Sequence, residues 1–251
     1  MKDKLYTIEL TDAMKSGEEC PLCYLERKLE QNAIEFVLGS SYMESDMREK
    51  TDQQGFCQKH TKIMYDYGNA LGNAWIWKSR LEYLRQGLEK QMDAFVPEKT
   101  SILDRWKKKE STKTGIGDWI RNEESHCYVC SRIEDTYARV LDTFTYLVKR
   151  DPDFLNLVKN CKGFCIHHFA DLTDICEKKL DSKEKEILFS VLFAQMNQQL
   201  ERVQGDIDWL IEKYDYLNAE KDWKNSKDAL PRTMQKIVGG YPADPVFKNQ
   251  K

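Results

Sequence analysis

Glycine and proline are scarce in this chain of 251 residues, which contains 12 Gly and 6 Pro. Glycine and proline break helices, whereas Leu, Lys, Glu, Gln and Met, which are plentiful here, favour helices and give sheets little support. The apolar share of 41% and the charged share of 32% are typical of a globular protein rather than of a disordered one. The composition therefore predicts an all-α fold.

Long apolar runs are also missing. The start, MKDKLYTIEL, lacks the apolar stretch of a secretory signal, and ILFSVLFA at 187–194 is too short for a membrane span. We therefore expect a cytoplasmic protein without a membrane partner. A basic excess is absent as well, because 39 basic and 42 acidic side chains give a net charge of −3. Nucleic-acid binding would have to be local.

Cysteine, in contrast, is abundant, with eight residues. Structural disulfides are not expected in a reducing compartment. Six of the cysteines belong to a pattern that occurs twice: Cys-x-x-Cys followed by Gly-Phe-Cys-x-x-His. The first copy has Cys20, Cys23 and GFCQKH at 55–60, and the second has Cys127, Cys130 and GFCIHH at 163–168. The two copies are offset by 107 and 108 positions, which indicates an internal repeat.

The repeat predicts four segments: an N-terminal module at 17–96, a linker at 97–118, a C-terminal module at 119–220 and a tail at 221–251 with one short helix. Apolar residues recur every three or four positions between the motifs of each half, and again in the longer region after each Gly-Phe-Cys-x-x-His motif. The predicted architecture is two tandem metal-stapled helical hairpins, each followed by a long helix, packed as a helical bundle. We expect these apolar stripes to be core or helix-pairing seams.

Two cysteines three positions apart can direct both sulfurs to one point, and a Cys and a His three apart share a helix face. Together they supply three sulfurs and one imidazole nitrogen, which is a closed ligand set of structural zinc. The predicted ligands, grouped by half, are Cys20, Cys23, Cys57 and His60, then Cys127, Cys130, Cys165 and His168. An iron–sulfur cluster or a thiol-redox role is the alternative for the same ligands. In each motif the glycine is expected to take a positive φ before the helix, and the phenylalanine to fill the local core.

The other Cys and His residues need separate assignments. His167 is expected at the surface or beside the ligands, and His126 in solvent. Cys161 could compete as a ligand, and Cys176 is expected in the core. No Ser-His-Asp arrangement, phosphate-binding glycine loop or His-Glu-x-x-His helix is present, and so no catalytic residue is predicted.

Three stretches, CPLCYLERKLE, the paired GFCQKH and GFCIHH, and KDALPRTMQKIVGG, carry a resemblance to a known family. The chain resembles, from about residue 17 to residue 241, an uncharacterised family of cytosolic proteins from anaerobic Gram-positive bacteria, filed as a domain of unknown function. The resemblance supports the pairing of the motifs but implies no activity, substrate or partner.

The sequence therefore favours a non-catalytic zinc-binding helical protein that acts as an adaptor or regulator through a protein partner. An iron–sulfur or thiol-redox protein is the first alternative. A nucleic-acid-binding zinc protein is the second, since 105–109 (RWKKK) place an aromatic residue in a basic run. In the tail, Trp223, Leu230, Met234 and Ile237 could form an apolar face that either caps the core or docks on a partner.

Overall fold

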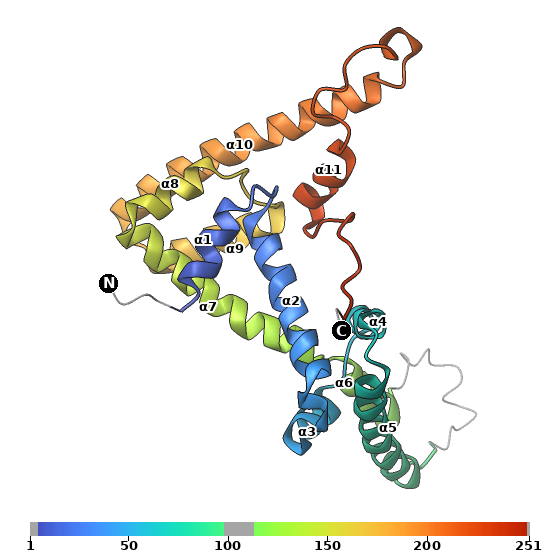
Figure 1. The fold of residues 1–251 in the computed structure, drawn as a ribbon. Helices are drawn as coiled ribbons and strands as arrows, with labels where there is room; N and C mark the ends of the chain where they lie inside the picture. Colours follow the sequence, from blue (N-terminus) through green and yellow to red (C-terminus); the bar gives the residue numbers. More distant parts are fainter. Residues whose placement is uncertain (1–4, 98–112, 250–251) are drawn as a thin grey trace, which may run out of the picture. The chain divides into compact units, whose positions relative to one another are not determined.

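The computed structural model describes residues 5–97 and 113–249, and these residues form helices and connecting segments without a strand (Figure 1). The all-α prediction is confirmed. The basic run at 105–109 and most of the linker expected at 97–118 lie outside the described residues. The α-helices are α1 (Thr7–Lys15), α2 (Pro21–Gly39), α3 (Ser45–Gln54), α4 (Gln58–Tyr67), α5 (Ala70–Asp93), α6 (Gly115–Glu124), α7 (Tyr128–Arg150), α8 (Pro152–Asn160), α9 (Ile166–Lys179), α10 (Ser182–Glu212) and α11 (Ala229–Val238), with short 3-10 turns at Ser41–Met43 and Tyr216–Asn218.

The chain divides into two compact units, and neither unit corresponds to one half of the repeat. Unit 1 comprises Met1–Leu29 and Glu134–Pro245, and unit 2 comprises Glu30–Ile133 and Val246–Lys251. Helix α2 therefore begins in unit 1 and ends in unit 2, and α7 does the opposite. These boundaries differ from the sequential modules expected at 17–96 and 119–220.

Helix length explains why each half does not close on itself. Helix α2 has 19 residues and carries the chain about 28 Å from the first Cys-x-x-Cys motif, whereas α3, with 10 residues, can return it by only about 15 Å. The second half repeats the mismatch, since α7 has 23 residues and α8 has 9. The Cys-x-x-His motif that follows the short helix thus stays far from the Cys-x-x-Cys motif of its own half.

Unit 1 has a core built from α1, the start of α2, and α7–α10. The rings of Phe144, Phe154 and Phe164 meet edge-on inside it, with centroids 5.7 and 6.5 Å apart. Phe164 is the phenylalanine of the second Gly-Phe-Cys motif, and it fills the core as predicted. Helix α8 begins at Pro152 with Asp151 as its N-cap, two residue types that favour a helix start.

Unit 2 has a smaller core that lies among α2, α4, α5 and the start of α7. It contains Ile34, Met64, Ile76 and Val129, all fully buried. The apolar stripe of α5 was expected to be core or a helix-pairing seam, but Leu81 is 69% exposed, Met92 is exposed, and Phe95, which follows the helix, is exposed as well. Helix α6 begins at Gly115, inside the expected linker, because the Thr114 side chain caps it by accepting from the Gly117 N–H group.

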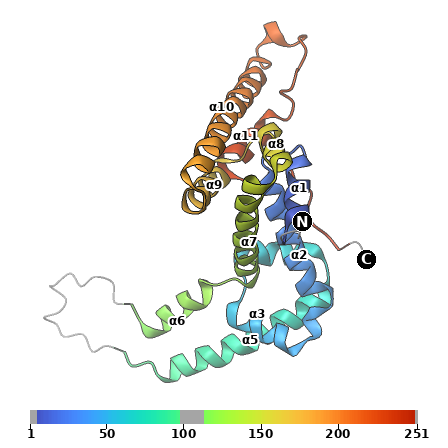
Figure 2. The same cartoon turned by 90° about the vertical axis from the view of Figure 1, so that its left-hand side faces the viewer.

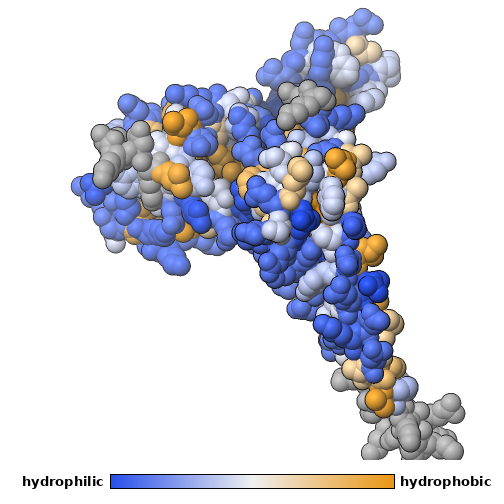
Figure 3. Space-filling view, turned by 60° about the horizontal axis from the view of Figure 1, so that its bottom comes forward, coloured by the Kyte–Doolittle hydropathy of each residue, from blue (hydrophilic) through white to orange (hydrophobic). Residues whose placement is uncertain are grey.

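The tail helix α11 packs against α9 and α10 within unit 1 (Figure 2). Its orientation is unusual, because Arg232, Gln235 and Lys236 are buried while Met234 and Ile237 are exposed. The one short helix expected in the tail is present, and Gly239 and Gly240 end it with positive φ. The surface drawn in Figure 3 is mainly hydrophilic, with hydrophobic residues in small separate groups. Among the described helices, none combines the length and apolar character needed to cross a membrane.

Candidate metal centres

The eight predicted ligands form two clusters, and each cluster lies inside one unit. Site 1, in unit 1, consists of Cys20, Cys23, Cys165 and His168, and all four are buried. The His168 Nδ1 atom lies 3.4 Å from the sulfurs of both Cys20 and Cys23 and 3.2 Å from that of Cys165. The Cys23 and Cys165 sulfurs are 3.6 Å apart, far beyond the length of a disulfide bond.

Site 2, in unit 2, consists of Cys57, His60, Cys127 and Cys130. The His60 Nδ1 atom lies 3.3 Å from the Cys57 sulfur, 3.3 Å from the Cys127 sulfur and 3.4 Å from the Cys130 sulfur. The sulfurs of Cys57 and Cys130 are 3.9 Å apart. This site is more open than site 1, because both of these cysteines are half-buried.

The grouping of ligands by half was therefore wrong. Each cluster joins the Cys-x-x-Cys motif of one half to the Cys-x-x-His motif of the other. Cys20 and Cys23 gather with Cys165 rather than with Cys57. The physical reason is the mismatch of helix lengths, which separates the two motifs of one half. A metal ion at either site would thus fasten one half of the repeat to the other instead of closing a hairpin.

All four motifs sit at helix starts. Cys20 and Cys127 immediately precede α2 and α7, while Cys57 and Cys165 are the N-cap residues of α4 and α9. The Cys165 sulfur accepts from the His168 N–H group at 3.5 Å. Free N–H groups and the helix dipole favour negative charge at this position, and so they stabilise thiolates. The preceding glycines, Gly55 and Gly163, have φ of 60° and 76°, as predicted.

Each histidine faces its cluster with Nδ1 and a carboxylate with Nε2. The Nε2 atom of His60 lies 3.0 Å from Oε1 of Glu30, and that of His168 lies 3.3 Å from Oε2 of Glu26. A carboxylate beside the second ring nitrogen fixes the tautomer and makes the coordinating nitrogen more basic. Sequence reasoning missed both glutamates. The signal that could have found them is their position on the helix that carries Cys20 and Cys23.

The electrostatics of the two clusters favour a cation at their centre. Burial lowers the pKa of His60, but hydrogen bonds with Cys127 and Glu30 outweigh it and raise the pKa to about 9. Burial raises the pKa of the Cys127 thiol, but the hydrogen bond with His60 helps to bring it down to about 6. At site 1 hydrogen bonds with Cys20 and Cys23 lower the pKa of Cys165. Burial and the neighbouring thiols raise the pKa of Cys130 to about 12, and so the three sulfurs of site 2 do not all ionise unless a cation lies between them.

The remaining Cys and His residues lie outside both clusters. Cys161 is buried and its thiol donates to the Val158 carbonyl at 3.2 Å, and Cys176 is fully buried in the core of unit 1, as expected. His126 is exposed, with Nδ1 at 2.8 Å from the Asn122 carbonyl. His167 is exposed and its Nε2 lies 3.7 Å from Asp171. None of these four residues joins either Cys3His set.

The end of α11 covers site 1, a contact that the sequence alone did not reveal. The Gly240 N–H group donates to the Cys23 sulfur at 3.3 Å. A Cβ atom on Gly239 would lie only 3.6 Å from the Cys165 sulfur, so the backbone itself packs on the cluster. The stretch KDALPRTMQKIVGG, which carries part of the family resemblance, therefore includes two residues that contact the predicted ligands of site 1.

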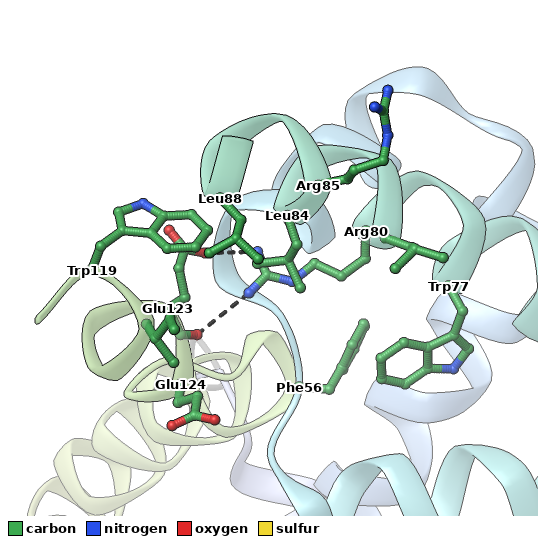
Figure 4. A pocket seen from close by; sticks show the side chains of 11 residues that line it. Phe56, Trp77, Arg80, Leu84, Arg85, Leu88, Trp119, Glu123 and Glu124 are labelled. Atoms are coloured by element: carbon green, nitrogen blue, oxygen red, sulfur yellow. Dashed lines mark hydrogen bonds and ion pairs between the residues drawn. The ribbon is translucent and has the colours of Figure 1, made fainter. Parts of the chain in front are cut away.

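Unit 2 also contains a cavity of about 540 Å³ between α5 and α6 (Figure 4). Trp119 forms one wall, and it fits because Gly87 has no side chain, since a Cβ there would lie 2.5 Å from the indole. The opposite wall holds Phe56, the residue before the ligand Cys57, with its ring centroid 5.4 Å from that of Trp77. The lining is mostly apolar but includes Arg80, Arg85, Glu123 and Glu124.

Comparison with known proteins gives a family without an assigned activity. The model of a family of unknown function, DUF6062, matches residues 1–244. An uncharacterized 23.9 kDa protein encoded in the xynA 3′ region of Caldicellulosiruptor sp. (strain Rt8B.4) is 22% identical over 204 residues, which cover 80% of this chain and 85% of that protein. No solved structure matches the chain. The match to the family model confirms the expected resemblance.

Proposed function

Because the chain belongs to the family of unknown function DUF6062, its chemistry has to be inferred from its own residues, and we propose that it is a non-catalytic zinc protein with two structural Cys3His sites. Site 1 would use Cys20, Cys23, Cys165 and His168, and site 2 would use Cys57, His60, Cys127 and Cys130. Four protein ligands complete a tetrahedron, whereas catalytic zinc keeps one position for water or substrate. The metal would serve folding rather than reaction.

The observation that carries this proposal is the spacing of the donor atoms. A zinc ion about 2.3 Å from each thiolate in a tetrahedron places two sulfurs about 3.8 Å apart. The Cys23–Cys165 sulfur pair at 3.6 Å and the Cys57–Cys130 pair at 3.9 Å match that spacing. An iron–sulfur cluster attaches its ligands to several iron atoms and needs more room between them. Thiolates and imidazole also disfavour magnesium and calcium, which prefer oxygen ligands.

Elemental analysis of protein purified without oxygen, combined with an absorption spectrum, tests the metal. We expect about two zinc ions per chain and no visible colour, because zinc has a filled d shell. A brown protein that contains iron and absorbs at about 400 nm would support the iron–sulfur alternative and contradict zinc binding. Protein that contains neither metal, and takes up neither after reduction of its thiols, would contradict metal binding altogether.

An adaptor role is the second part of the proposal, and α11 supports it. Leu230, Met234 and Ile237 are exposed at positions i, i+4 and i+7 of one helix face. This spacing is the anchor pattern of helices that bind in an apolar groove of another protein. Burial of Arg232 and Lys236 on the opposite face holds the anchors outward, although an isolated amphipathic helix would bury them. The partner would be a protein with an apolar groove.

A photo-cross-linking residue in place of Met234, introduced in the producing cells, tests this surface. The captured protein would then be purified and its dissociation constant measured by calorimetry for Ile237→Gln and for a control, Ile187→Gln. Ile187 is an exposed apolar residue of α10 in the same unit. We expect at least a tenfold loss, ~1.4 kcal/mol, for Ile237→Gln only. Equal losses, or capture of this chain alone, would contradict the adaptor role.

A further inference from the structure

One buried cation of unit 1 bridges the two segments that lead into site 1. Lys236 is only 1% exposed, and its Nζ donates to the backbone carbonyls of Glu19 and Lys162, each at 2.5 Å. Glu19 directly precedes the ligand Cys20, and Lys162 directly precedes the Gly-Phe-Cys motif of Cys165. The Glu19 carboxylate, which is also buried, lies 3.4 Å from the same ammonium group and is shared with Arg202 and Arg232.

Unit 2 contains the same arrangement with a different cation. The guanidinium of Arg80, which is 5% exposed, donates to the backbone carbonyl of Asp52 and, at 3.4 Å, to that of Glu123 (Figure 4). Asp52 lies three positions before Gly55, and Glu123 lies four positions before the ligand Cys127. The Glu123 carboxylate accepts from Arg80 at 2.9 Å. At both sites a buried cation therefore joins the approach to the Cys-x-x-His motif with the approach to the Cys-x-x-Cys motif.

The glycine of the first motif makes room for its cation, because a Cβ atom on Gly55 would lie 2.9 Å from the Arg80 guanidinium. At the second motif a Cβ atom on Gly163 would only make ordinary contact with Nζ of Lys236, at 3.7 Å. The two cations are not equivalent in the repeat, because the repeat offset of 108 from Arg80 leads to Leu188 in the core and not to Lys236. The two halves thus reached the same contact from unrelated parts of the chain, α5 and α11.

From these contacts we propose that Lys236 and Arg80 are positioning residues that hold the two ligand pairs of site 1 and site 2 together before metal binds. The proposal rests on the metal-binding function proposed above. Each site draws its ligands from segments at least 67 positions apart in the chain, and closing such a loop costs conformational entropy. A cation that already bridges the two backbones removes that cost from the binding step.

The test uses the full chain loaded with ¹¹³Cd, whose NMR spectrum gives one signal for each site, followed by competition with a chelator. Lys236→Met should weaken site 1 by about 10- to 100-fold, the usual effect of losing an outer-shell partner. It should leave site 2 within about twofold, as expected for an independent position. Arg80→Met should do the reverse, and Arg80→Lys should restore part of the affinity of site 2.

Lys213→Met is the matched control. Lys213 is likewise a buried lysine of unit 1 and donates to three backbone carbonyls, those of Asn218, Ala219 and Lys221, at 2.6–2.8 Å. These carbonyls do not belong to segments that carry ligands, and so both sites should keep their affinity. Equal weakening of both sites by Lys236→Met, an equal effect of the control on site 1, or unchanged affinities would each overturn the proposal.

A measurement on the metal-free chain separates this proposal from the metal-binding function. Mild oxidation of the stripped protein with diamide should join Cys165 to Cys23 or Cys20, because the backbone bridge made by Lys236 keeps these sulfurs adjacent. Peptide mapping should show that Lys236→Met loses this disulfide while Lys213→Met retains it. If the chain binds no metal, the proposed function fails, but this disulfide still tests whether Lys236 positions the cysteines. If Lys236→Met keeps the disulfide, the positioning role of Lys236 is refuted whether or not the chain binds metal.

Discussion

The Nε2 atom of His60 and the Oε1 atom of Glu30 lie 3.0 Å apart inside unit 2. With the carboxylate on Nε2, the proton of the neutral ring resides there, and Nδ1 is left to face the three sulfurs. His168 has the same orientation in unit 1, where Glu26 lies 3.3 Å from its Nε2. Both carboxylates come from α2, four positions apart in sequence. Glu30 thus orients His60 through a hydrogen bond, whereas Glu26 places a negative charge beside the Nε2 atom of His168, which has no hydrogen-bond partner among the described residues.

Replacing the glutamates should weaken one site at a time. We expect Glu30→Gln to lower the zinc affinity of site 2 by about tenfold, because an amide orients the imidazole less strongly than a carboxylate does. Glu26→Gln should act in the same way on site 1. Chelator competition monitored at each site is the measurement. Glu35→Gln, an exposed glutamate of the same helix, is the control and should change neither site. An effect of Glu35→Gln equal to that of Glu30→Gln would refute this orienting role.

Paired cysteine substitutions should reveal the crossed ligand sets directly. Cys23→Ala with Cys165→Ala removes two ligands of site 1, and so we expect one zinc ion per chain to remain. Cys23→Ala with Cys57→Ala removes one ligand from each site, and we expect both ions to be lost or bound weakly. Elemental analysis after gel filtration gives the count. The opposite result, with one ion retained only in the second variant, would restore the grouping by half.

Much of this could be predicted from the sequence because the signals were local. The spacing of Cys20 and Cys23, and of Cys165 and His168, identifies residues that share one helix turn, and the structure gathers all eight predicted residues into two Cys3His clusters. The scarcity of glycine and proline predicted helices, and the Gly-Phe-Cys motifs predicted the positive φ of Gly55 and Gly163. These inferences depend on neighbours within a few residues.

The pairing of the motifs could not be read from the same signals. The lengths of α2 and α3 determine which Cys-x-x-Cys motif meets which Cys-x-x-His motif. The matched spacing of the repeat, in contrast, suggests that each half binds its own ion. The helix lengths, 19 against 10 residues, decide otherwise. Apolar periodicity left open whether the apolar face of α11 packs on the core, and the structure leaves Met234 and Ile237 exposed. The burial of Arg232 and Lys236 instead depends on Glu19, which is distant in sequence.

Without metal, pH should act on site 2 through opposite pKa shifts. Hydrogen bonds with Cys127 and Glu30 overcome burial and raise the pKa of His60 from 6.5 to about 9, so the stability from its charged form is complete below pH 6.5 and is lost as pH rises through 9. Burial raises the pKa of Glu30, but hydrogen bonds with His60 and Lys59 bring it below 4.5, so its contribution is present above pH 4.5 and is lost on acidification.

The pKa of Cys127, lowered to about 6, adds a contribution that grows as pH rises from 6 toward 9 and offsets the loss from His60. The stripped protein should therefore lose stability below about pH 4.5 and change little between pH 6.5 and 9. Zinc adds a pH dependence of its own, because binding requires deprotonated thiols and a neutral imidazole, and so metal-loaded protein should gain stability from about pH 5 to pH 8. Urea unfolding midpoints across this range, with and without chelator, provide the measurement. Parallel pH profiles in the two states would show that the clusters do not exchange a proton for a metal.

Separated halves should fail to bind metal alone and succeed together. A fragment of residues 1–97 contains Cys20, Cys23, Cys57 and His60, but these belong to two different sites, and so neither this fragment nor 98–251 holds a complete ligand set. We expect each fragment alone to bind zinc weakly and to show reduced helicity by circular dichroism. An equimolar mixture should form a 1:1 complex with two zinc ions, and Cys165→Ala in the second fragment should reduce the count to one. Tight binding of one ion by each isolated fragment would contradict the crossed ligand sets, because a fragment can complete a site alone only if both motifs of one half bind the same ion.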